Sequence, residues 1–584
     1  MLIVKIPRVE YPRPQMKRDE WQNLNGWWDF EFDFSKSGLD REFYKNGEFT
    51  KKILVPFCPE SKLSGIGFTD FIPACWYRKS FSVKNLQSDV LLHFGAVDYE
   101  CIIYVNGHKA GTHRGGYSSF YFDITPYVSE GENSLIVYAA DDVRSGKQPR
   151  GKQCPTYHSA RCDYTRTTGI WQTVWLEFVP QTRIVSYKVI PDLANVAADI
   201  TVKLKGSTSG MNLAVTASFE GREMAAANVK INGDTSSLRL TLSESFPWDV
   251  GVGNLYDLTI KLESAGKEVD AVTGYFGLRC VYLKNGAIYL NNRPVYQRLV
   301  LDQGFYPDGI YTAPSDEALI NDIKLSMQLG FNGARLHEKV FEERFLYHAD
   351  KMGYLVWGEH ANWGLDHTVP ESLHYFLPEW LEIIERDFNH PSIVGWCPFN
   401  ETWDLEGKKQ YDETLRLTYL ATKAADPTRP VIDTSGNFHT DTDIYDVHDY
   451  DQDVESFAKK YKFLKKGEIH ETYPERQKHD GQPYFVSEYG GTFWSKQGSW
   501  TKNEDGWGYG ESPQSEDEFA ARYVGLTDAL LSSEGICAFC YTQLYDIEQE
   551  KNGLYTYERE PKFSMQTYEA IRKVNTQKAA IEEN

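Results

Sequence analysis

Long hydrophobic runs are missing from this sequence. None of its apolar stretches reaches the roughly 18 residues that a membrane-spanning helix requires. The first residues, MLIVKIPRVE, reach Pro7 and Arg8 before a hydrophobic segment of signal-peptide length has formed. The sequence therefore predicts neither a membrane span nor a leader, and we expect a cytoplasmic protein.

Paired cysteines and excess positive charge are also lacking. The 584 residues include nine cysteines, an odd number in a large chain, which is typical of reduced thiols rather than of a disulfide framework. Lysine and arginine number 62 against 83 aspartates and glutamates, so the formal net charge is −21. This charge repels phosphate backbones and anionic lipid, so we predict no nucleic acid and no membrane as a partner.

Signatures of cofactor and metal chemistry are absent as well. The sequence has no GxGxxG or GxxxxGK[ST] phosphate loop, no GxSxG nucleophile elbow, no HExxH and no EF-hand pattern. Cys537 and Cys540 have CxxC spacing, but the apolar run GICAFCY offers no second ligand pair, which favours two buried strand residues. We predict no cofactor and no metal.

Aromatic residues and alternating β patterns are abundant instead. Aromatic side chains make up 14% of the chain, and their faces stack on sugar rings or fill β-rich cores. Up to about residue 180, short alternating runs and the hairpin signal Asn106-Gly107 predict an all-β sandwich. Residues 181–276 repeat the β pattern at intervals of roughly ten residues, as in an immunoglobulin-like sandwich.

After residue 276 short apolar runs alternate with segments of helical spacing. This alternation is typical of βα units around a parallel sheet. One predicted helix has Ser315 as its N-cap and Gly330 just beyond its C-terminus. Eight strand-helix units in roughly 300 residues predict a (β/α)8 barrel. The predicted strands are residues 296–304, 330–338, 353–360, 392–401, 430–436, 443–450, 483–491 and 535–546.

Polar side chains stand at the ends of most of these strands. Active sites of such barrels lie at the C-terminal strand ends, where a barrel built only for stability has no reason to collect ionisable groups. Histidines on separate strands lack the spacing of a zinc site, so we expect them to bind hydroxyl groups. The strand-end residues are Asp302, Gln303, Arg335, His337, Glu359, His360, Asn400, Glu401, His448, Tyr450, Glu488, Tyr489, Tyr541, Gln543 and Asp546.

Two of these carboxylates follow buried strands directly. Glu401 ends the run SIVGWCPFN and Glu488 ends PYFVS. Strands four and seven lie on roughly opposite sides of a barrel mouth, so their side chains can converge on one pocket. Glycoside hydrolysis requires such a pair, with one carboxyl group protonated as an acid and the other ionised as a nucleophile.

These motifs resemble those of glycoside hydrolase family 2, which includes β-galactosidases, β-glucuronidases and β-mannosidases. The resemblance covers nearly the whole chain and implies a jelly-roll sandwich at 1–180, an immunoglobulin-like sandwich at 181–276 and a TIM barrel at 277–584. NHPSIVGWCPFNE is similar to the family's acid/base segment and FVSEYGG to its nucleophile segment. WYRKSF, IYVNG, GIWQTVWLE and NNRP are similar to the N-terminal domain and the barrel entry.

The resemblance implies catalytic roles. In a retaining mechanism Glu488 is the nucleophile and Glu401 the acid/base. Asn400 is placed to bind the sugar 2-hydroxyl, and Arg335 holds Glu488 ionised through a charge-assisted hydrogen bond. Tyr450 is expected to orient the nucleophile.

Further side chains are expected to bind the sugar. His448 and Asp302 are candidates for ring hydroxyls, and His337 takes the place of part of a family motif because the stretch after strand two reads RLHEKV. Tryptophans of the loop after strand seven either stack on sugar faces or merely order that loop. These tryptophans and the remaining substrate-binding candidates are Trp494, Trp500, Trp507, His360, Tyr541 and Lys551.

One departure from the family bears on the substrate. Where the glucuronidase branch grips the sugar C6 carboxylate with an Asn-x-Lys pair, this chain has Glu550-Lys551-Asn552. A second acid there opposes a uronic carboxylate, so we rank neutral hexosides or pentosides first, and Lys551 keeps the uronides open.

The predicted function is that of an exo-acting retaining β-glycosidase, β-galactosidase-like, with a glycoside or oligosaccharide as substrate. The alternatives are a glucuronidase or galacturonidase, a mannosidase or arabinosidase, and, from another class, a non-catalytic carbohydrate-binding protein. Retention of both Glu401 and Glu488 argues against the last. Members of this family commonly assemble through their sandwiches, so a homo-oligomer is one expectation. The basic loop 144–168 either reaches the barrel mouth of its own or a neighbouring subunit, or is simply solvated.

Overall fold

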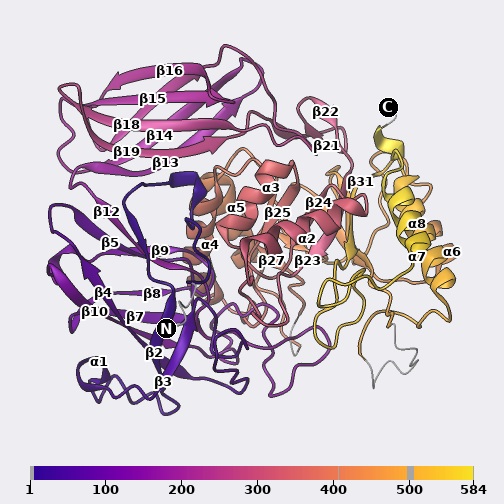
Figure 1. Ribbon diagram of the computed structural model, residues 1–584. Coiled ribbons are helices and arrows are strands. Elements are labelled where there is room, and N and C mark those ends of the chain that lie inside the picture. The colour runs from indigo at the N-terminus through magenta and orange to yellow at the C-terminus, as the bar shows by residue number, and fades with distance from the viewer. Residues whose placement is uncertain (1–5, 405–406, 496–505, 583–584) are drawn as a thin grey trace.

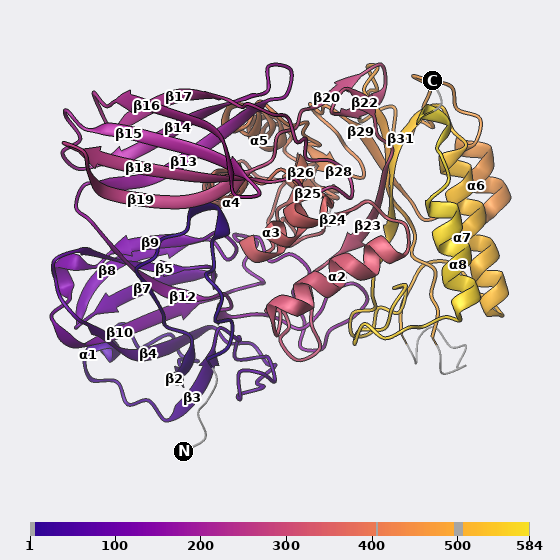
Figure 2. The same cartoon turned by 45° about the horizontal axis from the view of Figure 1, so that its top comes forward.

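The computed structural model describes residues 6–404, 407–495 and 506–582. Two β-sandwiches lie one above the other on one flank of a helix-surrounded parallel sheet (Figure 1). Helices α6, α7 and α8 cover the flank farthest from the sandwiches (Figure 2). Among the described residues, no helix is both long and apolar enough to cross a membrane.

The first sandwich packs two antiparallel sheets around one core, as the alternating patterns predict. Its core joins Trp28 and Tyr77 of one sheet to Leu92 and Leu176 of the other. The hairpin at Asn106 is confirmed, because Asn106 and Gly107 both have positive φ, as a type I′ turn requires. One sheet consists of β1 (Trp21–Asn23), β12 (Val174–Val179), β5 (Asp89–Phe94) and β9 (Phe120–Asp123). The other consists of β3 (Lys51–Val55), β2 (Gly26–Phe32), β4 (Ala74–Val83), β10 (Gly131–Ala140), β7 (Glu100–Val105) and β8 (His108–Arg114), and the short strands β6 (Val97–Asp98) and β11 (Gly169–Ile170) pair separately.

The second sandwich is smaller and has the alternation that predicted it. Along β15 every second side chain is buried, and its inward residues Leu213 and Val215 pack with Ile200 of the facing sheet. The three-stranded sheet comprises β13 (Arg183–Asp192), β14 (Ala197–Lys205) and β17 (Thr235–Thr241). The four-stranded sheet comprises β16 (Arg222–Lys230), β15 (Asn212–Phe219), β18 (Tyr256–Ser264) and β19 (Lys267–Phe276), and a ribbon of β20 (Val281–Lys284), β21 (Ala287–Leu290) and β22 (Arg293–Pro294) leads into the barrel.

The barrel strands are parallel and mostly buried on both faces, which explains their continuous apolar runs. A seven-stranded sheet runs in the order β26-β25-β24-β23-β31-β30-β29, and the two-stranded sheet β27–β28 supplies the end of strand four and strand five. The bounds are β23 (Gln297–Asp302), β24 (Gly333–Leu336), β25 (Leu355–Glu359), β26 (Ile393–Cys397), β27 (Phe399–Asn400), β28 (Thr434–Ser435), β29 (Tyr445–Asp449), β30 (Tyr484–Gly490) and β31 (Ile536–Thr542). Each predicted strand range contains one of these strands or strand pairs.

The prediction of a helix after every strand is wrong at one position. No helix separates β28 from β29, and all the residues between them lie in the described part of the chain. Asp433 explains this, because its carboxylate accepts the backbone N–H groups of Thr440 and Asp441 at 2.6 and 3.2 Å and thereby fixes a compact loop.

The other strands are followed by helices. The predicted N-cap is confirmed, since the Ser315 side chain accepts from the N–H of Ala318. The helices are α2 (Asp316–Gln328), α3 (Glu343–Met352), α4 (Ser372–Asp387), α5 (Asp412–Ala425), α6 (Val454–Tyr461), α7 (Glu516–Leu531) and α8 (Met565–Asn575), with the short α1 (Phe43–Asn46) in the first sandwich. Short 3-10 turns occupy Pro14–Met16, Thr125–Tyr127 and Ala580–Glu582.

All nine cysteines are unpaired, as the sequence predicted. Cys537 and Cys540 are buried in β31 within the barrel core, so their CxxC spacing is a packing feature.

Candidate active site

Two carboxylates and one histidine form the centre of the barrel mouth. Glu401 follows β27, Glu488 lies in β30, and His448 lies in β29. One carboxylate oxygen of each glutamate and one His448 nitrogen lie within 4.8 Å of one another. His448 bridges the pair, with Nδ1 2.8 Å from Glu401 Oε1 and Nε2 3.4 Å from Glu488 Oε1. The convergence predicted for strands four and seven is therefore present.

Glu488 is held as an anion. Arg335 Nη1 donates to Glu488 Oε1 at 3.0 Å, and the Tyr450 hydroxyl donates to Oε2. Burial by itself disfavours the charge, but His448 and Arg335 outweigh it and hold the pKa of Glu488 well below its usual range. An ionised carboxylate with directed donors on both oxygens is prepared for nucleophilic attack.

Arg335 is the hub of this arrangement. Its guanidinium is fully buried and also donates to Glu359 Oε2 and Asn400 Oδ1, both at 2.7 Å. Burial raises the pKa of Glu359, yet the Arg335 and His337 charges bring it down to about 2. His337 lies 2.9 Å from Glu359 and belongs to the same network.

Asn400 and Glu401 present their side chains differently. The Asn400 amide oxygen is taken by Arg335, whereas its buried Nδ2 has no partner among the described residues. That donor is suited to a ligand hydroxyl. Glu401 has a positive φ of 48°, and its N–H donates to Ser435 O at 2.9 Å, which turns the side chain out of the strand direction.

A cavity of about 440 Å³ opens beside Glu401. The loops after β25 and β27 form most of its wall, and the first sandwich adds two residues. Its lining includes Gly146, Arg150, Trp363, His367, Trp403 and Lys408. This space gives a bound molecule access to the Glu401 carboxyl group.

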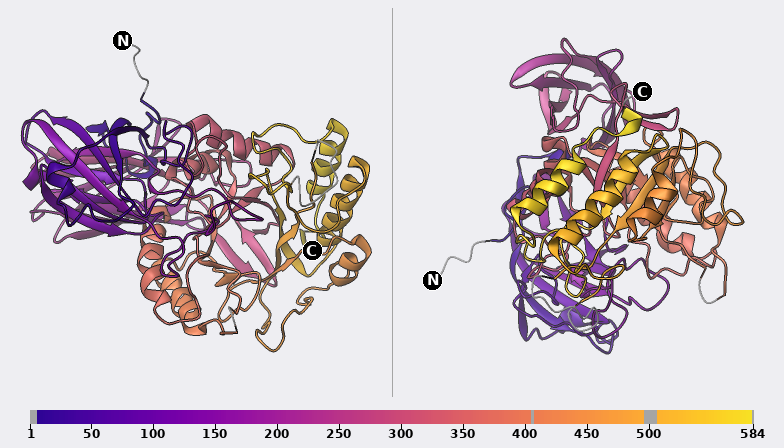
Figure 3. Two further views of the ribbon diagram at one scale, coloured as in Figure 1. Left: turned by 90° about the horizontal axis from the view of Figure 1, so that it is seen from below. Right: turned by 90° about the vertical axis from the view of Figure 1, so that its right-hand side faces the viewer.

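The basic loop 144–168 reaches the barrel of its own chain. The N–H of Arg150 donates to Trp363 O at 2.7 Å, and Gln303 Nε2 donates to the Tyr164 hydroxyl at 3.0 Å. Tyr164 in turn donates to Glu550, whose pKa burial raises to about 7. In the view from below, a segment of the first sandwich crosses over the barrel (Figure 3).

Five of the candidate residues lie outside the carboxylate cluster. Asp302 accepts from Tyr545 and from the N–H of Gly304, and burial raises its pKa to about 6. His360 packs between Phe376 and Trp380, with Nε2 3.4 Å from Glu379. These two side chains stabilise loops and the contacts between domains.

The other three serve the packing of the long loop after β30. The Tyr541 ring lies against Tyr523 of α7, outside the barrel, and the Trp494 ring stacks on Phe563. Lys551 uses its backbone N–H and carbonyl to bind Trp507 and Trp494, and in the described part of the chain no hydrogen bond or ion pair joins its side chain to Glu401 or Glu488.

The tryptophans of this loop have different positions. Trp507 packs edge-on against Tyr509, which stacks on Tyr450 at a centroid distance of 3.4 Å, so it supports the orienting phenol indirectly. Trp500 lies outside the described residues. Glu359, which shares Arg335 with Glu488, was visible as a strand-end acid but was not among the site residues selected from the sequence.

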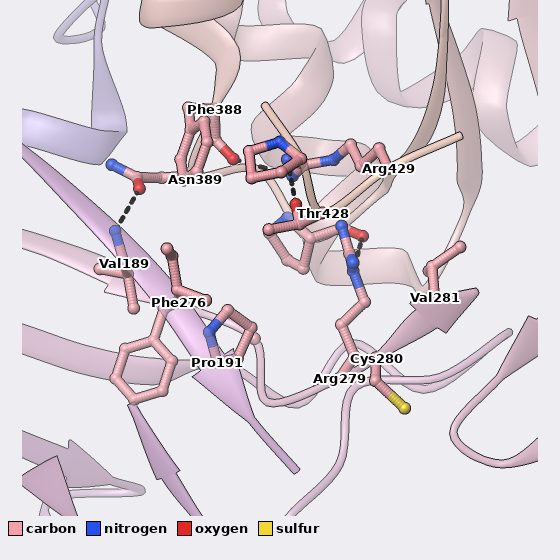
Figure 4. Close-up of a pocket in the computed structure, with 14 residues that line it drawn as sticks. Val189, Pro191, Phe276, Arg279, Cys280, Val281, Phe388, Asn389, Thr428 and Arg429 are labelled. Atoms are coloured by element: carbon pink, nitrogen blue, oxygen red, sulfur yellow. Dashed lines mark hydrogen bonds between the residues drawn. The ribbon is translucent and has the colours of Figure 1, made fainter. Parts of the chain in front are cut away.

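A second cavity, of about 260 Å³, lies at the opposite end of the barrel (Figure 4). It is lined by Phe388 and Asn389, which precede β26, by Arg429, which precedes β28, and by the end of β13. Arg279 in its wall donates to Pro391 O and Ile393 O at 2.9 and 2.7 Å. This cavity is part of the contact between the second sandwich and the N-terminal strand ends, far from the carboxylate pair.

Two β-sandwiches ahead of a TIM barrel, with paired carboxylates at its C-terminal strand ends, define a class of multidomain barrel proteins. The family description "Glycosyl hydrolases family 2, TIM barrel domain" matches residues 281–576, the "sugar binding domain" of the same family matches 63–180, and "Glycosyl hydrolases family 2" matches 182–279. The chain belongs to glycosyl hydrolase family 2.

Similar proteins include enzymes with different printed activities. A putative β-glucuronidase of Formosa agariphila is 27% identical over 364 residues, which are 60% of this chain and 42% of that protein. A β-galactosidase of Thermoanaerobacter pseudethanolicus is 28% identical over 356 residues, 57% of this chain and 46% of that protein. The chain thus spans less than half the length of these two relatives. A β-glucuronidase structure from Ruminococcus gnavus has a TM-score of 0.78 at 19% identity, covers 97% of this chain and 100% of its own, and shares the fold.

Replacing Arg335 by methionine is expected to destabilise the protein strongly. The variant leaves Glu359 and Glu488 buried without their shared cation, and loss of one partner of a buried ion pair costs about 3–5 kcal/mol. Because the native pKa values of both acids are depressed, their contribution to stability is present above the unfolded value near pH 4.3 and is lost as pH falls through the folded values. Urea unfolding from pH 7 to pH 3 measures this. The difference in free energy of unfolding between wild type and variant should become smaller toward low pH.

The matched control is Arg416→Met on α5. Arg416 is exposed and pairs with Glu413 and Asp441, both at 2.7 Å, so its loss should leave stability nearly unchanged. Equal effects of the two substitutions would contradict the role of Arg335 as a buried hub.

Removal of metal ions is expected to leave activity unchanged. Glu401, His448 and Glu488 have the spacing of a metal site, but the surrounding Glu488 and Glu401 charges raise the pKa of His448 despite its burial. A metal ion binds only the unprotonated ring nitrogen, so a raised pKa makes the proton a stronger competitor for this site. Activity after dialysis against EDTA, compared with activity after addition of Zn²⁺, Mn²⁺ or Ca²⁺, measures this; a loss that one of these ions restores would contradict the prediction.

Proposed function

We propose that this protein is an exo-acting retaining β-glycosidase, β-galactosidase-like in its preference for a neutral terminal sugar. The observation that carries the proposal is the separation of the two carboxyl groups. Retaining enzymes hold them about 5–5.5 Å apart, whereas inverting enzymes need about 6.5–9.5 Å to admit a water molecule. Oxygens of Glu401 and Glu488 within 4.8 Å fit the retaining geometry.

The mechanism follows from the charge states around the pair. Glu488, ionised and fixed by Arg335 and Tyr450, attacks C1 of the sugar while Glu401 protonates the departing oxygen. Water then attacks C1 of the glycosyl-enzyme as Glu401 accepts its proton, and Glu488 is released. The unpartnered Asn400 Nδ2 is available for the 2-hydroxyl, where a hydrogen bond strengthens in the transition state.

The structure supports terminal action on the sugar and a neutral substrate. Loop 144–168 packs on the barrel beside Gln303, and Tyr509, which follows β30, stacks on Tyr450, so both border the mouth and favour a pocket over an open cleft. The resemblance aligns Glu550 with the Asn-x-Lys pair of the glucuronidase branch, and Glu550 is buried close enough to Glu488 for their charges to interact, so a second acid there disfavours a uronic carboxylate. Among the alternatives, the uronidases are the second candidate, since several similar proteins carry β-glucuronidase names.

We also propose a cytoplasmic location and a homo-oligomeric assembly. Nine unpaired thiols support a cytoplasmic protein. The homo-oligomer is proposed because members of this family commonly assemble through their sandwiches.

Hydrolysis of a panel of p-nitrophenyl glycosides tests the proposed function. The panel comprises β-galactoside, β-glucoside, β-mannoside, β-glucuronide, β-galacturonide and α-L-arabinosides. We expect the β-galactoside to be cleaved with the highest kcat/KM, and Glu488→Ala controls for contaminating activity. Cleavage of a uronide alone would replace the galactosidase preference, and binding without cleavage of any member would favour a carbohydrate-binding protein.

A further inference from the structure

Lys152 is a buried cation at the barrel mouth that pairs with no carboxylate. It belongs to loop 144–168 of the first sandwich and is only 6% exposed. Its Nζ lies over the Trp363 ring, 3.4 Å from the ring centroid. In the described part of the chain this Nζ makes neither a hydrogen bond nor an ion pair. A buried ammonium group in a folded protein ordinarily has such a partner.

Lys152 lies beside the cavity that opens at Glu401, because its ring partner Trp363 lines that cavity. Burial lowers its pKa, but Cys162, Glu401, Glu338 and Glu488 together raise it above the usual value. These carboxylates follow β24 and β27 or lie in β30, which come from different sides of the barrel. The contact with Trp363 thus brings Lys152 to the barrel mouth, where the charges of these acids act on it.

The backbone holds this lysine rigidly in place. The preceding Gly151 has φ +58°, and a Cβ there would come within 2.3 Å of Glu338 O, so only glycine allows the loop to approach the barrel this closely. On one side the N–H of Arg150 donates to Trp363 O at 2.7 Å, and on the other Lys152 O accepts from the N–H of Tyr164 at 2.7 Å. The side chain is therefore preorganised for a ligand rather than mobile.

The contact with Trp363 leaves the hydrogen-bonding capacity of the ammonium group unused. The group has three N–H donors, and an aromatic face offers none of them an oxygen acceptor. A sugar bound at the Glu401–Glu488 site would bring such oxygen acceptors to the ammonium group. Hydroxyl oxygens and a uronic carboxylate are two sources of the same acceptor chemistry.

We propose that Lys152 is a substrate-binding residue that determines specificity: delivered by the first sandwich, its ammonium group donates hydrogen bonds to oxygen atoms of the terminal sugar. This inference rests on the proposed glycosidase function. It also gives loop 144–168 a role, because a barrel without that loop would lack part of its sugar pocket.

Lys152→Met tests the inference, since methionine keeps the apolar stem and removes the charge. Loss of a hydrogen bond from a charged group should lower kcat/KM by about 10- to 100-fold, mainly through KM, with Tm unchanged. Lys147→Met, at an exposed lysine of the same loop, is the matched control and should behave as wild type. Lys152→Gln is made in parallel, so that a folding defect of one variant does not decide the result.

Measurements with the β-galactoside and the β-galacturonide distinguish the two sources of oxygen. A loss confined to the galacturonide places Lys152 on the carboxylate, and equal losses place it on a hydroxyl that both sugars share; either supports the proposal. An unchanged kcat/KM in both variants, or a loss that in both accompanies a fall in Tm, overturns it.

Calorimetric titration with D-galactono-1,4-lactone and D-galacturonate separates this inference from the proposed function. If the wild type binds either probe but cleaves no glycoside, the proposed function fails while weaker binding by Lys152→Met still supports the sugar contact. Equal binding by wild type and variant, or no binding by the wild type, overturns the contact.

Discussion

Glu488→Ala is expected to lower kcat by on the order of 10⁴- to 10⁶-fold, the range seen when a nucleophile is removed from an enzyme. The loss should be severe for good and poor leaving groups alike, because without the nucleophile the glycosyl-enzyme cannot form. Tm should fall, because the variant loses the contribution that ionised Glu488 makes to stability, but by less than in Arg335→Met, because Arg335 keeps its partner Glu359.

Rescue of Glu488→Ala by azide tests whether Glu488 is the nucleophile, which the loss of activity alone does not show. Azide can enter the space left by the carboxylate and attack C1 from the same face, and the product is then the α-glycosyl azide. Glu455→Ala, at an exposed glutamate of α6, is the matched control. A Glu488→Ala protein with wild-type kcat, or one that yields the β-glycosyl azide, contradicts the assignment of Glu488 as nucleophile.

Glu401→Ala is expected to lower kcat by about 10²- to 10⁴-fold on glycosides with poor leaving groups. The acid assists departure of the aglycone, so 2,4-dinitrophenyl glycosides, which need no proton, should form the glycosyl-enzyme at a nearly normal rate. The intermediate then accumulates because water has lost its general base, and a burst of dinitrophenol should appear in stopped-flow measurements.

The azide product also distinguishes the acid/base role of Glu401 from the nucleophile role of Glu488. In Glu401→Ala it attacks the glycosyl-enzyme from the face opposite Glu488, so the product is the β-glycosyl azide. Losses of equal size on both kinds of leaving group, without a burst, would show that Glu401 is not the acid/base.

The strand pattern and the carboxylate pair could be predicted from the sequence because both follow from local rules. Buried parallel strands give continuous apolar runs, and the C-terminal end of such a run is where a barrel places its chemistry. Glu401 and Glu488 each follow such a run, as Glu359 does at the end of β25, and the structure brings Glu401 and Glu488 together.

The outward strand-end residues could not be separated from the inward ones by position alone. Successive side chains along a strand point to opposite faces, so a shift of one residue moves a side chain from the pocket to the helix layer. Glu488 faces the mouth, while the neighbouring Tyr489 bonds Thr527 of α7. Tyr541 faces the same helix, and the pattern of β31, buried throughout, gives no sign of it.

Lys152 lay beyond sequence reasoning for a different reason. Its partner Trp363 stands more than 200 positions away in the chain, in another domain, and the contact depends on how a sandwich packs on a barrel. The basic composition of loop 144–168 was visible, but only the structure shows that it enters the mouth of its own barrel.

The anomeric configuration of the first-formed product tests the central claim most directly. Proton NMR during hydrolysis of the best p-nitrophenyl β-glycoside by wild-type protein resolves the two anomers before mutarotation mixes them. Two displacements at C1, by Glu488 and then by water, predict that the β-anomer appears first. The α-anomer as first product would mean a single displacement and would contradict the retaining mechanism built on the Glu401–Glu488 pair.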